Sequence, residues 1–226
     1  MTFSLIGRCA ATGQFGAVVT TSSVGVGARV PFARAGVGAV LTQHRTDPRL
    51  GPLGLDLLAR GFTAQQAVNA IVAATPHRAW RQVAAIDAAG RTAHYDGAHV
   101  RPAISVAHGR DCVGAGNILR NTAVAPAMVA RFEADVALPL AARLVRAIQA
   151  GEDAGGETAA VVSASLLVVD RESFPFVDLR VDAHARPLEE LARLWALYEP
   201  TAEDYVRRAI DPDGACAYVA PPAKSD

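Results

Sequence analysis

The chain opens with MTFSLIGR (residues 1–8), in which residues 3–8 alternate apolar and polar side chains around Leu5. This alternation predicts a short β-strand. The segment ATGQ (residues 11–14) predicts a turn, and residues 15–22 continue as a second apolar strand. A β-hairpin is therefore expected to begin at the second residue of the protein.

The remaining chain divides into blocks of strands and blocks of helices. Strands are expected at residues 36–43, 82–87, 91–96, 161–170 and 174–182, with shorter pieces around Ile104 and Val113. Helices are expected at residues 53–60, 63–72, 123–135 and 138–150, and from Pro187 to Tyr198. Thr63 and Gln66 have the spacing of a capping box. This order lacks the βαβ alternation of a parallel sheet. It fits an α+β fold in which two antiparallel sheets pack face to face with helix pairs outside.

The composition excludes several classes of protein. The 226 residues include 22 basic and 22 acidic side chains, and Lys224 is the only lysine. A formal charge of zero with 19% charged residues argues against a nucleic-acid-binding protein, which carries a clustered basic face. No apolar run approaches the ~18 residues of a membrane span, and residues 1–8 lack the features of a signal peptide. We therefore expect a cytoplasmic protein with no nucleic-acid or membrane partner.

The length suits one domain with its own hydrophobic core. No internal repeat, low-complexity block or linker divides the chain, so residues 1–226 are interpreted as a single domain. Residues 211–226 are rich in proline and glycine and are expected to form a loose C-terminal tail.

Short motifs give little support for cofactor chemistry. Glycine pairs occur at positions 25/27, 36/38 and 114/116, but none extends to the third glycine of a dinucleotide-binding fingerprint. The three cysteines, at positions 9, 112 and 216, lack the spacing of a disulfide or metal site and are interpreted as small buried residues. No cofactor is expected.

A group of histidines and neighbouring residues is a second candidate for metal chemistry. Its members are His94, Asp96, His99, His108, Asp111 and Cys112. No two of these histidines lie at i and i+4 on an expected helix, so loop and surface histidines are the favoured interpretation. Metal-dependent hydrolysis through His94, His99 and His108 stays open as an alternative. A triad containing Ser22 and His108 also stays open, although no spacing supports it.

Thr2 is the more informative position. Removal of Met1 leaves a free N-terminal threonine at the start of the first strand. Such a residue carries a complete nucleophilic device, because its hydroxyl attacks while its own α-amine accepts the proton. The unperturbed pKa of an α-amine, near ~8, suits a general base at neutral pH.

Six segments of the chain resemble the DUF1028 family, which is placed within the N-terminal-nucleophile (Ntn) hydrolase-like fold. These segments are MTFS (1–4), VPFARAGVGAV (30–40), TQ (42–43), PRLGPLGL (48–55), GNIL (116–119) and SASLLVV (163–169). They span nearly the whole chain in the expected order. The chain departs from the family pattern at Val161 and Val162, where the family usually has polar residues.

The resemblance implies a four-layer αββα sandwich with Thr2 at the position of the nucleophile. It implies that Arg34 takes the place of the basic residue near the nucleophile, where it would lower the pKa of the amine or bind a substrate carboxylate. Ser22 or Ser23 would orient the terminal amine. Residues 114–117, with Gly116 and the Asn117 amide, would form an oxyanion hole. Gln43 lies in a resembling segment and is a candidate substrate-binding residue.

The leading hypothesis is an amidohydrolase that cleaves a C–N bond of a small molecule, an amide or a cyclic ureide, through Thr2. An alternative is a catalytically silent Ntn-like protein that binds a small metabolite or acts as an oligomeric scaffold. The absence of the lysine that threonine-type enzymes commonly use favours this alternative, because Lys224 lies in the expected tail. By analogy with the fold class, a homo-oligomer is expected.

Overall fold

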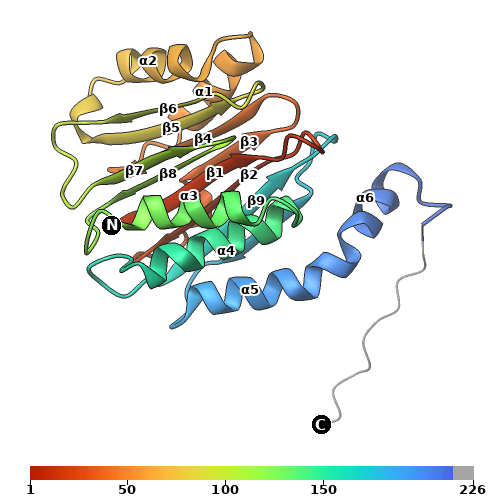
Figure 1. The fold of residues 1–226 in the computed structure, drawn as a ribbon. Coiled ribbons are helices and arrows are strands. Elements are labelled where there is room, and N and C mark those ends of the chain that lie inside the picture. The colour runs from red at the N-terminus through yellow and green to blue at the C-terminus, as the bar shows by residue number, and fades with distance from the viewer. Residues whose placement is uncertain (216–226) are drawn as a thin grey trace.

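A computed structural model describes residues 1–215 of the chain (Figure 1). Ten strands form two sheets within these residues, and every strand pair is antiparallel. Of the expected C-terminal tail, residues 211–215 contain no helix or strand, and residues 216–226 lie outside the described residues.

The larger sheet has six strands in the order β10-β9-β2-β1-β8-β7. Their bounds are β1 Thr2–Arg8, β2 Phe15–Thr21, β7 Ser105–Gly109, β8 Cys112–Asn117, β9 Ser163–Val169 and β10 Val177–Val181. The smaller sheet has the order β3-β4-β5-β6, with bounds β3 Pro31–Arg34, β4 Gly38–His44, β5 Arg81–Asp87 and β6 Thr92–Asp96. The expected hairpin at the start of the chain is confirmed as β1 and β2, in which Phe3 pairs with Thr20.

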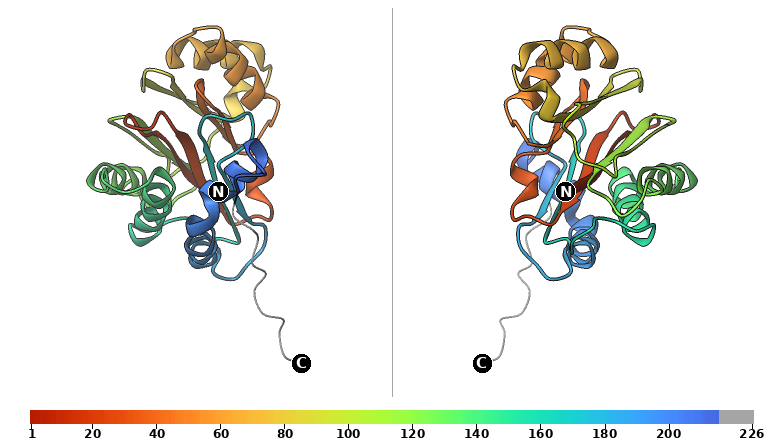
Figure 2. Two further views of the ribbon diagram at one scale, coloured as in Figure 1. Left: turned by 90° about the vertical axis from the view of Figure 1, so that its right-hand side faces the viewer. Right: turned by 90° about the vertical axis from the view of Figure 1, so that its left-hand side faces the viewer.

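Helices cover the outer face of each sheet. Helices α1 (Leu50–Ala59) and α2 (Ala64–Ala74) lie on the smaller sheet. Helices α3 (Val124–Ala134), α4 (Leu140–Asp153) and α5 (Pro187–Tyr198) lie on the larger sheet, and α6 (Ala202–Ile210) extends beyond it. The two side views in Figure 2 show the order helix, sheet, sheet, helix. The predicted four-layer αββα sandwich is therefore confirmed.

The alternation along β1 divides its side chains between two cores. Phe3 and Leu5 pack with α3 and α4 on the helical side, whereas Ile6 belongs to the core between the sheets. Because side chains on a strand alternate between faces, Thr2 and Ser4 also point into the space between the sheets. The strand pattern thus places a polar pair at one end of an otherwise apolar layer.

Three local expectations need correction. One strand was expected at residues 36–43 and none at residues 31–34, but PFAR (31–34) forms a separate strand, β3, joined to β4 by a turn in which Gly36 has φ 70°. The last helical region continues after a 3₁₀ turn as α6, which the sequence did not indicate separately. Pro52 lies in the first turn of α1, where proline is tolerated, so this helix begins at Leu50 rather than at residue 53.

The predicted capping box is confirmed. The backbone N–H of Gln66 donates to Thr63 Oγ1 at 3.2 Å, and the backbone N–H of Thr63 donates to Gln66 Oε1 at 2.9 Å. Within residues 1–215, no helix is both long and apolar enough to cross a bilayer.

Candidate functional site

Thr2 begins β1, a central strand of the larger sheet, and is 6% exposed. It pairs directly with Asn117 at the end of β8. Side chains of directly opposed residues lie on the same face of a sheet, so both point between the two sheets. The Thr2 hydroxyl lies 3.4 Å from the hydroxyl of Thr21, which ends β2. Three strands therefore bring polar side chains together at one end of the sandwich.

Met1 lies against this group. Its main-chain carbonyl oxygen accepts hydrogen bonds from the hydroxyls of Thr2 and Thr21. Its thioether sulfur accepts a hydrogen bond from Thr158 Oγ1 at 3.1 Å. Burial lowers the pKa of the Met1 amine; the charge of Glu157 opposes this effect and that of Arg101 adds to it. The amine therefore lies within electrostatic reach of one acid and one base.

A chain of amide side chains joins the two sheets behind Thr2. Ser4 Oγ donates to Gln43 Oε1 at 2.8 Å, and Gln43 Nε2 donates to Gln82 Oε1 at 2.6 Å. Asn117 Nδ2 donates to the same Gln82 oxygen at 2.9 Å. All four residues are at most 1% exposed. Gln43, a predicted substrate-binding residue, thus lies in the network that positions Asn117.

The orientation of the Asn117 amide follows from this network. Gln82 Nε2 donates to Asp96 Oδ1 at 2.8 Å and to the carbonyl oxygen of Gly116 at 3.1 Å, which fixes Gln82 with its oxygen toward Asn117. Asn117 must therefore present its Nδ2 to Gln82. Its Oδ1 is buried and has no donor among the described residues. Asn117 is therefore expected to offer an acceptor to the site through Oδ1. Its amide N–H groups face Gln82, so this orientation does not support the predicted role of Asn117 as an oxyanion donor.

Glu157 is the acid of the site. It is 2% exposed, and its Oε2 accepts the backbone N–H of Ser22 at 3.1 Å, while its Oε1 has no partner among residues 1–215. Burial raises the pKa of Glu157 to about 7, against the lowering effects of the Ser22 hydrogen bonds and the terminal amine. Ser22 thus orients Glu157, one step removed from the terminal amine.

Two other predicted residues lie elsewhere. Arg34 ends β3 and pairs with Gly38 of β4. Gln43, which lies in the site, is five residues farther along β4, so about 17 Å of extended strand separates it from the position of Arg34. The Arg34 guanidinium forms an exposed ion pair with Asp56 at 2.8 Å. The Ser23 hydroxyl accepts from Arg29 at 2.7 Å and is exposed. Neither side chain is brought to Thr2, because the β3–β4 turn and the loop after β2 carry them away.

The backbone N–H groups of residues 114–117, which were expected to form the oxyanion hole, lie in a strand that pairs with a neighbour on each side. β8 is an interior strand, in which Gly114 faces Leu5 on one side and Ala107 on the other. Gly116 in turn faces Phe3 and Ser105. The main-chain groups of an interior strand serve its two neighbours. The group of Gly116 that reaches the site is its carbonyl oxygen, which accepts a hydrogen bond from Gln82 and cannot donate to an oxyanion.

The histidines do not assemble into the alternative metal site. His94 Nδ1 and His108 Nε2 lie 2.7 Å apart, whereas His99 packs edge-on against Trp80, with ring centroids 4.8 Å apart. Among residues 1–215 no group of three or more histidine, cysteine or acidic side chains could hold a metal ion. Ser22 contacts Glu157 rather than His108, so the open triad is not formed either.

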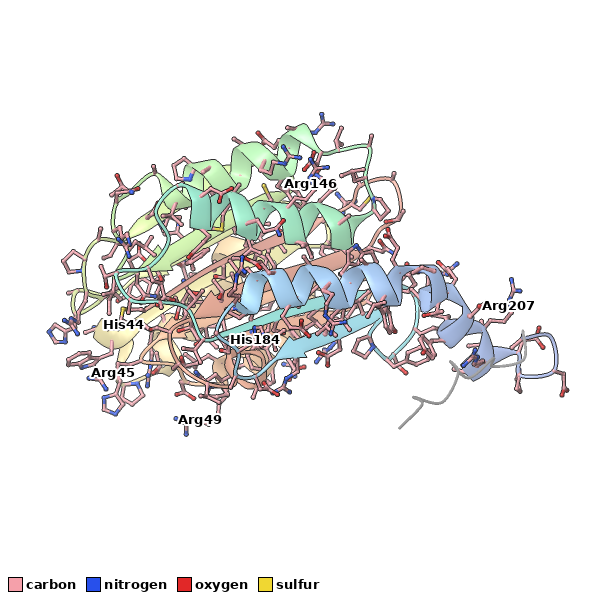
Figure 3. The ribbon with its side chains drawn as sticks, turned by 90° about the horizontal axis from the view of Figure 1, so that it is seen from below. His44, Arg45, Arg49, Arg146, His184 and Arg207 are labelled. Carbon is pink, nitrogen blue, oxygen red and sulfur yellow. The ribbon has the colours of Figure 1, made fainter. Side chains whose placement is uncertain are left out.

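His44 and Arg101 lie near the N-terminal amine. The charge of the terminal amine lowers the pKa of His44, although burial is the larger cause, and the backbone N–H of Arg101 lies 3.4 Å from His44 Nε2. Figure 3 shows His44 and Arg45 together at one end of the molecule, the end at which the N-terminus lies in Figure 1. Arg101 is therefore the cation that acts on the N-terminal amine, in the place expected for Arg34.

Sequence reasoning missed Thr21, Gln82, Glu157 and Arg101. Thr21 and Gln82 lie in strands that were predicted, and the signal was a polar residue at the end of each strand. Glu157 lies in a polar loop, and tertiary contacts hold it at the site: an isolated bridge with Leu119 and hydrogen bonds from Ser22 and Arg120. No local pattern identifies such a contact.

The architecture defines a class: a four-layer αββα protein whose candidate site surrounds the start of a central strand at the N-terminus of the chain. The chain belongs to DUF1028, described as a family of unknown function, whose model matches residues 2–191. The crystal structure of protein SPO2555 from Silicibacter pomeroyi, also assigned to DUF1028, is similar with a TM-score of 0.83 and 29% identity, over 92% of this chain and 94% of that one.

A more remote structural match is Anbu (ancestral beta-subunit) from Yersinia bercovieri, with a TM-score of 0.38 and 9% identity. The match covers 91% of this chain and 97% of that chain. None of the curated proteins matches the sequence.

Proposed function

We propose that this protein is an amidohydrolase that cleaves a C–N bond of a small amide or cyclic ureide through Thr2, after removal of Met1. The observation that carries the proposal is a pair of buried acceptors around the start of β1, Asn117 Oδ1 and Glu157 Oε1, for which residues 1–215 provide no hydrogen-bond donor. A buried acceptor without a donor is costly. The N–H groups of a free Thr2 amine are suitable donors for both.

In the proposed reaction the neutral Thr2 amine accepts the proton of the Thr2 hydroxyl while Oγ attacks the substrate carbonyl carbon. The C–N bond then breaks, and the amine returns the proton to the leaving nitrogen. The product remains as an ester on Thr2 Oγ. Water, deprotonated by the same amine, attacks this ester and releases the acid, which restores the hydroxyl.

Thr21 is the proposed oxyanion donor. In the structure its hydroxyl donates to the carbonyl oxygen of Met1, which lies within reach of the Thr2 hydroxyl. Once Met1 is removed, a substrate carbonyl oxygen is expected to occupy the same position and accept the same hydrogen bond. Asn117 then orients the amine through Oδ1 instead of holding the oxyanion.

Glu157 and Arg101 act on the charge of the Met1 amine: Glu157 stabilises its protonated form, whereas burial, the largest cause, and Arg101 favour the neutral form. Removal of Met1 is expected to bring the Thr2 amine under the same influences, and the reaction needs that amine neutral. Arg101 is also the proposed partner of a carboxylate on the substrate.

The experiment is a turnover assay against a panel of small amides and cyclic ureides, with the wild type, Thr2→Ala, Thr2→Ser and Thr12→Ala. Thr12 is an exposed turn residue at the other end of β1 and serves as the control. Activity should be lost in Thr2→Ala, retained in part in Thr2→Ser and unchanged in Thr12→Ala. Undiminished turnover by Thr2→Ala would refute the proposal.

A silent metabolite-binding protein is the second candidate. Its support is the position of Arg34, which leaves no cationic side chain in hydrogen-bond contact with Thr2 among the described residues. Saturable binding of a panel compound without product formation, by wild type with a verified free Thr2, would favour this function over hydrolysis.

A further inference from the structure

A cavity of about 530 Å³ lies at the end of β1 opposite Thr2. Arg8 ends this strand and lines the cavity, and six residue steps along an extended strand separate it from Thr2 by about 20 Å. The other polar lining residues are Cys9, Arg110, Asp111, Glu133 and Arg143, and the remainder is mainly alanine and valine. This cavity is therefore separate from the candidate site at Thr2.

Arg143 is the unusual residue of this cavity. It lies on α4 and is only 4% exposed. Its Nε and Nη2 both donate to the carbonyl oxygen of Phe132, at 3.2 and 3.1 Å, and its guanidinium carbon lies 3.8 Å from the centre of the Phe132 ring. No carboxylate oxygen of residues 1–215 is within 4.0 Å of it. A buried cation with neutral partners alone is costly, which indicates that an anion belongs beside it.

The remaining charges leave the cavity positive. Arg8 and Asp111 neutralise each other in an ion pair of 3.0 Å. Glu133, which also lines the cavity, accepts the backbone N–H of Arg110 at 2.6 Å. Among the lining residues three arginines face two carboxylates. The charge of Asp135 also acts on Arg143, but its carboxylate is already paired with Arg131 and Arg146, so the excess positive charge belongs to the buried Arg143. One negative charge on a ligand would balance it.

We propose that this cavity binds a small monocarboxylate with a compact apolar body. Arg143 and Arg110 hold the carboxylate, since a guanidinium presents paired N–H donors that match its two oxygens. The apolar body lies against the alanine and Val136 side chains of the lining. A carboxylate is favoured over a phosphate dianion because the cavity offers a single excess positive charge.

Cys9 provides a reporter inside the cavity. It is free and partly exposed, whereas Cys112 is fully buried and burial raises the pKa of its thiol to about 12. Burial opposes ionisation of Cys9, but hydrogen bonds from Thr12 and Ala11 and the charge of Arg143 lower the pKa of its thiol. Alkylation of Cys9, followed on its own tryptic peptide by mass spectrometry, therefore measures access to the cavity.

The test compares iodoacetate, itself a small carboxylate, with the neutral amide iodoacetamide. In both reactions the Cys9 thiolate displaces iodide and a carbon–sulfur bond forms. We expect saturation kinetics with iodoacetate, and a ratio of iodoacetate to iodoacetamide rates at least tenfold above that of free cysteine. Benzoate should slow the alkylation by iodoacetate, and benzamide should not.

Variants locate the effect. Arg110→Gln changes an exposed side chain and should reduce the rate ratio several-fold, while Arg60→Gln, an exposed arginine beyond α1, should leave it unchanged. Arg143→Met should abolish saturation; its fold is checked by circular dichroism. If it fails to fold, Arg110→Gln decides the outcome. A rate ratio equal to that of free cysteine, protection by benzamide or by phosphate alone, or an unchanged ratio in Arg110→Gln would overturn the proposal.

Discussion

Asn117 shows how one side chain acquires its role from residues distant in sequence. Its amide is fixed by Gln82, which is itself fixed by Asp96 and by the carbonyl of Gly116. Because each amide group in this chain has one consistent orientation, the unpaired atom must be an acceptor. The sequence indicated that Asn117 belongs to the site, and only the network determines that it offers an oxygen.

At the same scale, Glu157→Gln tests the buried acid. A carboxyl group whose folded-state pKa is raised to about 7 contributes stability that is present below about pH 4.5 and is lost as the pH rises through 7. The wild type should therefore lose stability relative to Glu157→Gln between pH 5 and pH 8, by on the order of 2–3 kcal/mol. Urea unfolding of both proteins across this range measures the difference. A difference that does not change with pH would contradict the assignment.

Thr21→Val tests the proposed oxyanion donor. The substitution keeps the shape of the side chain and removes its hydroxyl, so turnover on an accepted substrate should fall by about 10²-fold. Thr21→Ser keeps the hydroxyl and should retain most of the activity. Steady-state kinetics should show the loss in kcat rather than in KM, since the bond strengthens as charge develops on the carbonyl oxygen. Equal rates for Thr21→Val and wild type would remove Thr21 from the mechanism.

At the scale of elements, the sequence predicted the strands and helices that have a strong local pattern and missed those whose pattern is short. The β1–β2 hairpin and the start of α2 were predicted from alternation and from the capping box. Strand β3 has four residues and pairs with β4 at the edge of the sheet that the described residues form, so its pattern was too short to separate from the strand that follows. Glu157 reaches the site through tertiary contacts of a loop, which no periodicity reports.

Thr63→Ala tests the capping box. The variant loses the hydrogen bond to the backbone N–H of Gln66, and the free energy of unfolding should decrease by about 1 kcal/mol. Thr12→Ala, which changes an exposed turn, is the matched control and should differ from wild type by much less. Urea denaturation monitored by circular dichroism distinguishes the two. Equal stabilities would show that the cap does not limit the stability of α2.

At the scale of the molecule, the expected homo-oligomer stays a prediction. Helices α5 and α6 leave Leu197 64%, Tyr205 43% and Ile210 60% exposed, a set of apolar side chains suited to contact with a second copy. Figure 3 shows α6, which carries Arg207, extending from one end of the molecule. Light scattering after size exclusion should give a mass above that of one chain. A monomer at all micromolar concentrations would contradict the expectation, and cytoplasmic location likewise stays a prediction.

The proposed hydrolysis depends on the free amine of Thr2. Its most direct test is the intact mass of catalytically active protein purified from its native host, together with an assay of protein released from a cleavable N-terminal fusion so that Thr2 is the first residue. We predict that active protein is lighter by one methionine residue, and that activity arises only when the fusion is cleaved. Active protein that retains Met1 would show that Thr2 does not act as an N-terminal nucleophile.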